Sequence, residues 1–582
     1  MAKNKVALTA GGPAGSGVFT IGAMFARSVQ KLGLWVYYTA DYASLIKGGH
    51  NSCYVRAEPE EIHSQIKLSD ILVAIDKLTV QKHFEGLSHE GALIYDSSSF
   101  EINDIDMSKR RDIKIFAIPF TKLGRDLGDK IYGNIVAVGA VSALVNHPLE
   151  KLYVALEKQF GAKKGSEVVE INKKAAKLGY DYLKENYKGV SFKVTLEEIK
   201  NQPTLLLSGN EAACIGAIKA GVKLVAEYPM TPSSSILSFM AANENKYNIV
   251  VKHTEDEIAA MNMLTGAGMT GARCMTGTSG GGFALMTEAI GMAGLSETPC
   301  VIFESQRTGP STGMPTYTEQ SDLRFAMHAS QGEFPRLIVA PGDVEEAFYE
   351  SFKIFNLCDR VQTPGIVLLD KHLSESSRTV KVFDTSKLKV ERGKLMTNEQ
   401  MAKATAFKRY ELTADGISPR CIPGQPNGMH VSSSYEHDET GWTTEESAMR
   451  IAQVDKRARK LLAIKDEEIA PKLYGDADAD LTIVSWGSNK GMVLEAMKFL
   501  KNEGLKVNFL QILWVLPFPT KKVTEILSKA KKTLMVEQNH DAQMRGVIRE
   551  FTGINIKETL LKYDGRPIDP EDIYFRAKEV LK

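Results

Sequence analysis

Short apolar segments alternate with amphipathic stretches along most of this 582-residue chain, and glycines or prolines stand at many of the junctions. At its start an apolar segment at 6–8 leads through a glycine-rich turn at 11–17 into an apolar-periodic stretch at 19–32, and a second apolar segment follows at 35–38. Strands that alternate with helices in this way are typical of α/β domains built on a parallel sheet. The pattern predicts the α/β class with doubly wound domains.

The alternation falls into three units. The first covers 1–195, the second 203–375 and the third 471–582, and at about 100–200 residues per domain each has the size of one domain. Between the last two, residues 376–470 are rich in prolines, glycines and charges, which is typical of a linker strap. Strands are expected at 6–8, 35–38, 71–75, 115–118, 249–251, 301–303, 337–339, 365–369, 481–484, 507–510 and 533–536.

The charge balance and the cysteines exclude several classes of protein. The chain carries 72 basic and 71 acidic side chains, a formal net charge of +1, so no overall field attracts nucleic acid or an anionic membrane. The N-terminus lacks the apolar stretch of a signal peptide, and no window reaches about 18 uninterrupted apolar residues. The six cysteines are scattered, which fits neither a disulfide framework nor a metal site. We expect a cytoplasmic protein with reduced thiols and no metal ligands.

Two glycine-rich loops in the first unit are candidates for binding a phosphate-bearing ligand. The loop at 11–17 joins a strand to a helix, where backbone N–H groups and the helix dipole favour an anion. Its spacing matches neither GxGxxG nor the Walker pattern, and a tight turn without a ligand explains the glycines equally well. A second polar loop at 47–51 is expected at the same end of the strands. The candidate residues are Gly15, Gly17, Gly48 and Gly49.

A proline-bracketed turn stands near the start of the second unit. The run Tyr228-Pro229-Met230-Thr231-Pro232 follows an apolar strand, and its two prolines fix a rigid turn that presents a threonine hydroxyl. Such a turn suits a binding site, but the exit of a strand and the cap of the following helix would have the same pattern. Taken alone, the turn leaves both interpretations open.

Three acidic residues, Glu255, Asp256 and Glu257, precede a helix that is rich in small residues. Acidic groups at a helix N-terminus are favoured by the helix dipole, which explains two of the three. Glu257 is followed by Gly266-Ala267-Gly268, so the helix can be buried closely, and a buried carboxylate needs a partner. Glu257 is therefore the acid for which we expect a role.

Arg307 follows a later buried strand of the second unit, the one at 301–303. A hydroxyl-rich glycine loop at 276–283 opens a helix, and Arg307 comes directly after the strand at 301–303 and its short extension. Ligands of α/β domains bind at the carboxyl ends of strands, where a guanidinium can hold a carboxylate by two parallel hydrogen bonds. An ordinary surface arginine is the alternative, but the glycines around Arg307 favour a binding role.

In this order the motifs resemble those of the 2-oxoacid:ferredoxin oxidoreductases, in the form in which a γ-type domain precedes the α subunit. The likeness covers essentially the whole chain. The family's YPxTP turn, glutamate segment, TxTSGxGF loop and QRxGPSTGxPT run correspond to residues 228–232, 255–260, 276–283 and 306–316. Segments at 485–488, 516–519 and 536–539 resemble its transketolase C-terminal-like domain. The family's usual GGQG is replaced by Gly-Pro-Ala-Gly-Ser-Gly at 12–17, which weakens a ligand assignment there.

The resemblance implies a γ-type domain, a pyrimidine-binding thiamine diphosphate domain and a transketolase C-terminal-like domain, in that order. It further implies that a glutamate contacts the aminopyrimidine ring and so activates the cofactor for attack on a 2-oxoacid. Glu257 aligns best with this glutamate, and Glu255 is the competing choice. The implied cofactor contacts also include Tyr228, Pro229 and Thr231, and the implied substrate contacts are Arg307, Thr231 and Thr316.

A partner subunit follows from what the sequence lacks. It has no GDG-plus-asparagine motif for Mg²⁺ and diphosphate, and no set of cysteines for a [4Fe–4S] cluster. The resemblance therefore implies a β subunit that carries both, an active site shared between the subunits and a pair of such heterodimers. Electrons would leave through the cluster to ferredoxin, and coenzyme A would take the acyl group.

The resemblance favours 2-oxoglutarate as substrate and succinyl-CoA as product, with the reverse carboxylation chemically open. Pyruvate and branched-chain 2-oxoacids are alternatives because their enzymes share these motifs. A noncatalytic nucleotide-binding scaffold is an alternative of another class, and it would leave Glu257 and Arg307 without a role. The glycine loops of the first unit become candidate CoA contacts.

Overall fold

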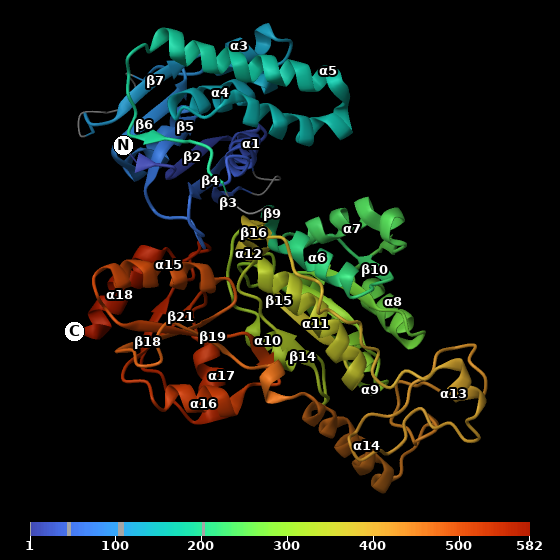
Figure 1. The fold of residues 1–582 in the computed structure, drawn as a ribbon. Coiled ribbons are helices and arrows are strands. Elements are labelled where there is room, and N and C mark those ends of the chain that lie inside the picture. The colour runs from blue at the N-terminus through green and yellow to red at the C-terminus, as the bar shows by residue number, and fades with distance from the viewer. Residues whose placement is uncertain (1, 44–47, 103–109, 201–203) are drawn as a thin grey trace. The chain divides into compact units, whose positions relative to one another are not determined.

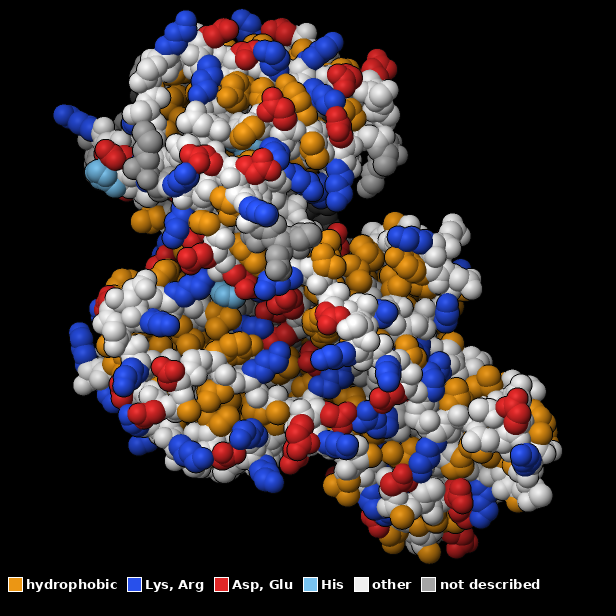
Figure 2. Space-filling model, in the orientation of Figure 1, with side chains coloured by type: hydrophobic (Ala, Val, Ile, Leu, Met, Phe, Trp, Pro, Cys, Tyr) orange, Lys and Arg blue, Asp and Glu red, His pale blue; other side chains and the backbone are white. Residues whose placement is uncertain are grey.

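The computed structural model of the protein describes residues 2–43, 48–102, 110–200 and 204–582, with the side chains of all of these except 162–164. The chain folds into two compact units (Figure 1). The first unit comprises the residues up to Ser208, Glu375–Phe383 and Asp569–Glu571, and the second comprises Gly209–Ser374, Asp384–Ile568 and Asp572–Lys582. None of the described helices is long and apolar enough to cross a membrane. Basic and acidic side chains are interspersed on the face shown in Figure 2.

An eight-stranded mixed sheet forms the centre of the first unit, in the order β7-β6-β5-β2-β4-β3-β16-β9. Strands β2, β5, β6 and β7 are parallel, and β4, β3, β16 and β9 continue the sheet with antiparallel pairings. The strands are β2 (Val6–Pro13), β3 (Trp35–Asp41), β4 (His50–Glu58), β5 (Ser69–Ala74), β6 (Leu87–Asp96), β7 (Lys114–Ile118), β9 (Thr204–Ser208) and β16 (Ser377–Lys381). The helices are α1 (Val18–Gln30), α2 (Lys77–His83), α3 (Phe120–Asp126), α4 (Gly133–Leu144) and α5 (Leu149–Asn186).

The expected α/β class of the first unit is confirmed, but the expectation of a parallel sheet is wrong for half of its strands. Strand β3 ends at Asp41 and β4 begins at His50, so the connection is too short for the crossover that a parallel pair requires. The two strands therefore pair antiparallel. Lys47, in the second glycine-rich loop, lies outside the described residues. Residues 204–208, which the sequence pattern assigns to the second unit, form strand β9, and this strand is hydrogen-bonded into the first sheet through β16.

A seven-stranded sheet carries the motifs of the second unit, in the order β11-β10-β12-β13-β15-β14-β20. All neighbours are parallel except β14 and β20. Its strands are β10 (Leu224–Glu227), β11 (Val250–His253), β12 (Cys274–Thr278), β13 (Val301–Gln306), β14 (Leu337–Val339), β15 (Gly365–Asp370) and β20 (Trp514–Leu516). The helices along it are α6 (Gly209–Lys219), α7 (Ser234–Tyr247), α8 (Glu257–Met269), α9 (Gly280–Leu295), α10 (Leu323–His328) and α11 (Val344–Val361).

The C-terminal part forms a five-stranded sheet in the order β17-β19-β18-β21-β22. Its elements are β17 (Lys472–Tyr474), β18 (Leu481–Trp486), α15 (Asn489–Asn502), β19 (Val507–Ile512), α16 (Thr520–Leu527), β21 (Thr533–Glu537), α17 (Gln543–Thr552), β22 (Glu558–Leu561) and α18 (Pro570–Leu581). One buried core continues from Phe283 and Ile302 of the seven-stranded sheet to Val484 and Leu510 of this one. The two sheets belong to one compact unit for this reason.

Residues 384–446, which we call the strap, contain one short helix, α13 (Asn398–Ala402), and no strand. Helix α14 (Ser447–Arg459) follows the strap. Ion pairs with little exposure to solvent hold the strap on the second unit: Arg420 of the strap and Arg273 of the domain both pair with Asp359 of α11. The expected absence of regular structure is thus found over most of 376–470, although β16 and α14 are regular.

Candidate active site

Three neighbouring strands of the seven-stranded sheet bring the predicted motifs to one edge. Strands β10, β12 and β13 are adjacent and parallel, so their carboxyl ends lie together. The turn Tyr228–Pro232 follows β10, helix α9 begins at Gly280 after β12, and Arg307 follows β13. Glu257 begins α8, after the edge strand β11. The strand order therefore gathers motifs that lie far apart in the sequence.

The three acids before α8 have three different environments. Asp256 caps the helix, because its carboxylate accepts a hydrogen bond from the backbone N–H of Ala259 at 2.7 Å. Glu255 is exposed. Glu257 is only 3% exposed, and no donor among the described residues forms a hydrogen bond to its Oε1. A buried polar atom without a partner costs free energy, so the position of Glu257 is unfavourable for the fold unless a ligand supplies a donor.

Gly282, in the first turn of α9, has no side chain, and this leaves room for the Glu257 carboxylate. A Cβ at this position would lie 2.5 Å from Glu257 Oε1 and would also strike the Thr278 hydroxyl. The backbone N–H of Gly282 donates to the sulfur of Met230 at 3.3 Å, so the proline-bracketed turn contacts the same point. The structure thus joins the turn, the glycine loop and the acid around Gly282.

Arg307 is tied to the same turn. Its Nη1 donates a hydrogen bond to the backbone oxygen of Thr231 at 2.7 Å. Burial lowers the pKa of Arg307 from the ordinary arginine value, and the Asp322 carboxylate opposes this shift. A half-buried guanidinium fixed by a backbone carbonyl is well prepared to bind a carboxylate.

The other residues predicted to contact the cofactor or the substrate lie nearby, and the structure supports them to different degrees. Tyr228 is 37% exposed, so its ring is open to a ligand. Thr316 is buried in the loop between β13 and α10, which closes on itself where Thr308 N donates to Tyr317 O at 3.1 Å. The roles of Tyr228, Pro229 and Thr316 stay predictions.

Two acids at this edge were not among the predicted site residues. Glu304 of β13 is fully buried, and burial followed by the neighbouring Asp322 holds its pKa well above the usual range. Asp322 lies against the backbone of Gly280, and burial raises its pKa to about 6. Burial thus favours the neutral form of Glu304, and Asp322 is the acid whose charge opposes the lowered pKa of Arg307.

A sequence signal for such acids exists. Glu304 lies in the run Val-Ile-Phe-Glu-Ser-Gln, and Glu227 ends the run Leu-Val-Ala-Glu. An ionisable residue inside an apolar strand is rarely buried without a reason, and the end of a parallel strand is where sites form. Glu227 is also fully buried, and burial raises the pKa of its carboxyl well above the usual range.

The two glycine-rich loops of the first unit meet each other. The backbone N–H of Ala14 donates to Gly49 O at 2.8 Å. Gly15 and Gly17 have φ of +81° and +83°, and any side chain at Gly17 would strike the amide of Asn134. A cavity of about 490 Å³ lies beside the first loop, at the carboxyl ends of the parallel strands, and its charged lining residues are Arg125, Lys130, Asp96 and Asp129. The positions of these loops suit an anionic ligand.

Comparison with known proteins identifies the class. Three family models match in succession: pyruvate ferredoxin/flavodoxin oxidoreductase at 7–182, pyruvate flavodoxin/ferredoxin oxidoreductase, thiamine diphosphate-binding, at 215–456, and pyruvate:ferredoxin oxidoreductase core domain II at 479–573. Fold and site together therefore define a thiamine diphosphate-binding oxidoreductase subunit. The chain belongs to the 2-oxoacid:ferredoxin oxidoreductases, and the resemblance in its motifs is confirmed.

Relatives match over nearly the whole chain. The α subunit of 2-oxoacid:ferredoxin oxidoreductase 2 from Aeropyrum pernix is 31% identical over 99% of this chain and 98% of its own length. The subunit KorA of 2-oxoglutarate synthase from Methanothermobacter thermautotrophicus is 32% identical over 63% of this chain and 96% of its own. The solved 2-oxoglutarate:ferredoxin oxidoreductase from Magnetococcus marinus, with 2-oxoglutarate, coenzyme A and succinyl-CoA bound, is 32% identical, covers both chains fully and has a TM-score of 0.90.

Proposed function

We propose that this chain is the cofactor-activating and substrate-binding subunit of a 2-oxoglutarate:ferredoxin oxidoreductase. The reaction breaks the bond between C1 and C2 of 2-oxoglutarate, releases CO₂ and transfers the succinyl group to the thiol of coenzyme A. The two electrons of this oxidation pass to ferredoxin, one at a time, and the reverse carboxylation uses the same groups. The buried carboxylate of Glu257, with Oε1 unpaired among the described residues, is the observation that carries the proposal.

The residues around Glu257 fit the aminopyrimidine side of thiamine diphosphate. Glu257 Oε1 is a buried acceptor beside a glycine, and the ring of Tyr228 is accessible in the adjacent turn. We assign Glu257, Tyr228, Pro229 and Thr231 to hold this ring. When bound, the cofactor supplies an electron sink for the charge that CO₂ leaves behind.

This chain's own groups then have separable roles. Glu257 Oε1 accepts a hydrogen bond from a ring nitrogen and so sets the protonation of the aminopyrimidine. Arg307, fixed by Thr231 O at 2.7 Å, binds the carboxylate of the 2-oxoacid, and Thr316 completes the substrate contacts. Asp322 limits the positive charge at Arg307 before substrate arrives.

A partner surface next to Glu257 supports a shared active site. Ile258 and Met263 of α8 are 47% and 41% exposed, and Leu285 of the neighbouring helix α9 is 51% exposed. Exposed apolar side chains near a site favour a protein partner. We propose that a β subunit covers this surface and brings Mg²⁺, the diphosphate site and a [4Fe–4S] cluster, in a pair of αβ heterodimers.

The replacement Glu257→Gln in the complex assembled with its β subunit tests the proposal. We expect a loss of about 100-fold or more in 2-oxoacid-dependent ferredoxin reduction, because general acid–base groups contribute about 10²–10⁴ in rate. The matched control is Glu255→Gln two residues earlier, which is exposed and should leave the rate unchanged. Full activity of the Glu257→Gln complex would refute cofactor activation by this residue and would favour a scaffold role.

Substrate choice needs its own measurement. Steady-state assays of the same complex with 2-oxoglutarate, pyruvate, oxaloacetate and a branched-chain 2-oxoacid, each with CoA and ferredoxin, compare kcat/KM directly. We expect 2-oxoglutarate to give the largest value, since both the KorA relatives and the Magnetococcus marinus enzyme carry its name. A preference for pyruvate would overturn the substrate and leave the role of Glu257 standing.

A further inference from the structure

A small cavity lies between the strap and the loop that follows α9, apart from the active site. Arg409, Arg420, His430 and Ser432 of the strap line one side, and residues 296–299 with the end of α8 line the other. About 10 Å³ is available to the centre of a water-sized sphere. This is room for one water molecule or one monatomic ion.

Two buried arginines present unpaired N–H groups at this cavity. Arg409 is 4% exposed and donates through Nη2 to Glu297 O at 2.9 Å, but its Nη1 finds no acceptor in the described part of the chain. Arg420 is 3% exposed and donates through Nη2 to Asp359 Oδ1 at 2.9 Å. Neither Nε nor Nη1 of Arg420 has an acceptor among the described residues. Buried donors of this kind require a ligand to receive them.

The nearby carboxylates are already committed to other cations. Glu297 pairs with Lys456 at 2.6 Å and with Lys460 at 2.5 Å. Asp359 pairs with Arg273 at 2.8 Å and with Arg392 and Arg420 at 2.9 Å each.

The buried cluster therefore holds more positive than negative charge. Glu297 and Asp359 face the buried arginines Arg273, Arg409 and Arg420, the buried lysines Lys456 and Lys460, and the partly exposed Arg392. Burial lowers the pKa of Lys460 to about 7, so this lysine carries only part of a charge at neutral pH, and the excess remains positive. A water molecule would accept the hydrogen bonds but would not balance this charge.

Other groups around the cavity do not balance it either. The Nδ1 of His430 lies 2.9 Å from Gly428 O, and burial lowers the pKa of this imidazole, so the ring is neutral. The Ser432 hydroxyl is 2.6 Å from the Tyr410 hydroxyl. Two further acids of the strap are paired with other cations: Glu436 pairs with Arg450 and Arg457, and Glu439 pairs with Lys408.

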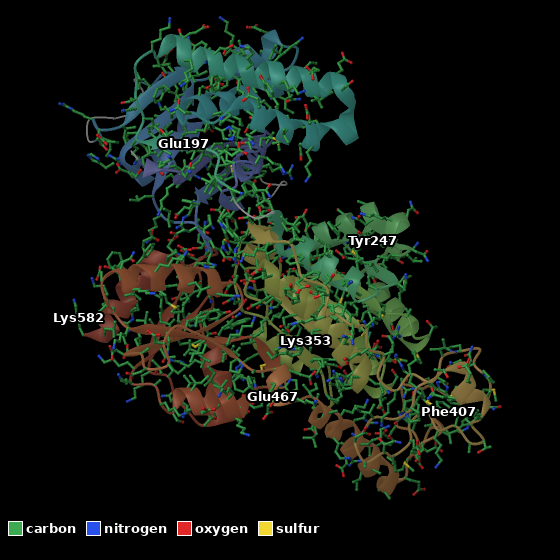
Figure 3. The ribbon with its side chains drawn as sticks, viewed as in Figure 1. Glu197, Tyr247, Lys353, Phe407, Glu467 and Lys582 are labelled. Atoms are coloured by element: carbon green, nitrogen blue, oxygen red, sulfur yellow. The ribbon has the colours of Figure 1, made fainter. Side chains whose placement is uncertain are left out.

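From these contacts we infer that the cavity binds one small monovalent anion, with chloride as its ordinary occupant, held by the guanidinium groups of Arg409 and Arg420. The anion fastens the strap to the α8–α9 side of the second unit. Phe407, labelled in Figure 3, marks the stretch of the strap next to Arg409, and its ring lies 6.0 Å from that of His430. This site goes beyond the proposed function, because it does not depend on the cofactor or the 2-oxoacid.

Bromide gives a direct test on the unmodified protein. Crystals of the purified protein grown in bromide should show an anomalous peak between Arg409 and Arg420. A map with bromide peaks elsewhere and only a water molecule at this position would overturn the inference. The experiment does not rely on a variant, so a folding defect cannot obscure it.

Thermal unfolding at constant ionic strength provides the second measurement. We expect chloride and bromide to raise Tm by about 3 °C or more over gluconate, and the rise to saturate, because a ligand that binds only the folded state stabilises it. Arg409→Gln should remove the halide-specific rise, whereas Arg576→Gln should keep it, because Arg576 is a partly exposed residue of α18 that pairs with Glu558 and Glu579 and does not line the cavity. Equal Tm values in chloride and gluconate would contradict the site.

Discussion

At the scale of single residues, the site depends on the space that one glycine leaves for one carboxylate. Glu257 is buried with Oε1 beside Gly282, and the turn that holds Arg307 contacts the same glycine through Met230. The position of the Glu257 carboxylate thus depends on the absence of a side chain at Gly282.

Gly282→Ala should damage catalysis more than stability. Its Cβ would lie 2.5 Å from Glu257 Oε1, so the carboxylate must move. We expect activity to fall about 100-fold, as misplacement by about 1 Å can cause, and stability to fall by about 1–3 kcal/mol. Gly281→Ala is the matched control, because a Cβ there meets only Met230 Cε at 3.9 Å. Equal kcat in the two variants would show that the position of Glu257 is not critical.

Asp322 gives a prediction for pH. Burial raises its pKa to about 6 from 3.8. An acid whose pKa is raised in the folded state destabilises the fold progressively as pH rises from the unfolded pKa through the folded one. Asp322→Asn removes this penalty. As pH rises from 4 to 7, the free energy of unfolding of the variant should therefore increase by about 2 kcal/mol relative to that of the wild type. Unfolding by denaturant at pH 4 and pH 7 measures this difference in free energy, and Asp541→Asn, at an exposed position, is the control. A difference between variant and wild type that is the same at both pH values would contradict the raised pKa of Asp322.

At the scale of elements, the sequence predicted individual strands and helices best, because apolar residues recur with a different period in each. The expected strands at 301–303, 337–339 and 365–369 all lie within observed strands, and the helix expected at 19–32 is α1. The sheet order was not predictable from period alone, because pairing depends on the lengths of the connections. The short connection between Asp41 and His50 reverses β4 and so makes the first sheet mixed.

The candidate site was predictable only in part, because a local sequence pattern marks some of its residues and not others. Glu257 stands at the start of a helix, and Arg307 stands directly after the end of a strand, two residues before Gly309, so the pattern around them indicates a site. Glu304 stands inside an apolar strand, so the sequence indicates a buried acid there, but only its neighbour Asp322 connects it to the site. The ion pairs of the strap also depend on contacts between distant segments, which no local pattern records.

Asp359 should be the residue on which attachment of the strap depends most. Its carboxylate pairs with Arg273, Arg392 and Arg420, and Asp359→Asn would leave these cations without their counter-charge. Breaking a buried pair costs about 3–5 kcal/mol, so we expect a loss of this size in the free energy of unfolding and faster proteolysis within 384–446. Asp415→Asn, whose partner Lys394 is 43% exposed, should change stability by less than about 1 kcal/mol. Similar losses in the two variants would contradict a special role for Asp359.

At the scale of the whole molecule, the two compact units carry different candidate sites, and each site can be tested separately. The second unit holds Glu257 and Arg307, and the first holds the paired glycine loops and a cavity lined by Arg125 and Lys130. The phosphates of coenzyme A are anions of the kind that glycine loops, helix N-termini and cationic side chains bind. We propose on this basis that the first unit contributes to CoA binding.

Lys130→Ala in the assembled complex should therefore raise the KM for CoA and leave kcat and the KM for the 2-oxoacid unchanged. Loss of one charge-assisted contact to a phosphate costs about 1.4 kcal/mol, which is a tenfold change in affinity. Lys122→Ala is the matched control, since this lysine lies on α3 close to the cavity but does not line it. An unchanged KM for CoA would assign the glycine loops to the fold alone, while a raised KM for the 2-oxoacid would show that the two units do not bind their ligands independently. The expected result, a change confined to CoA, would separate the binding of the acyl acceptor from the activation of the cofactor.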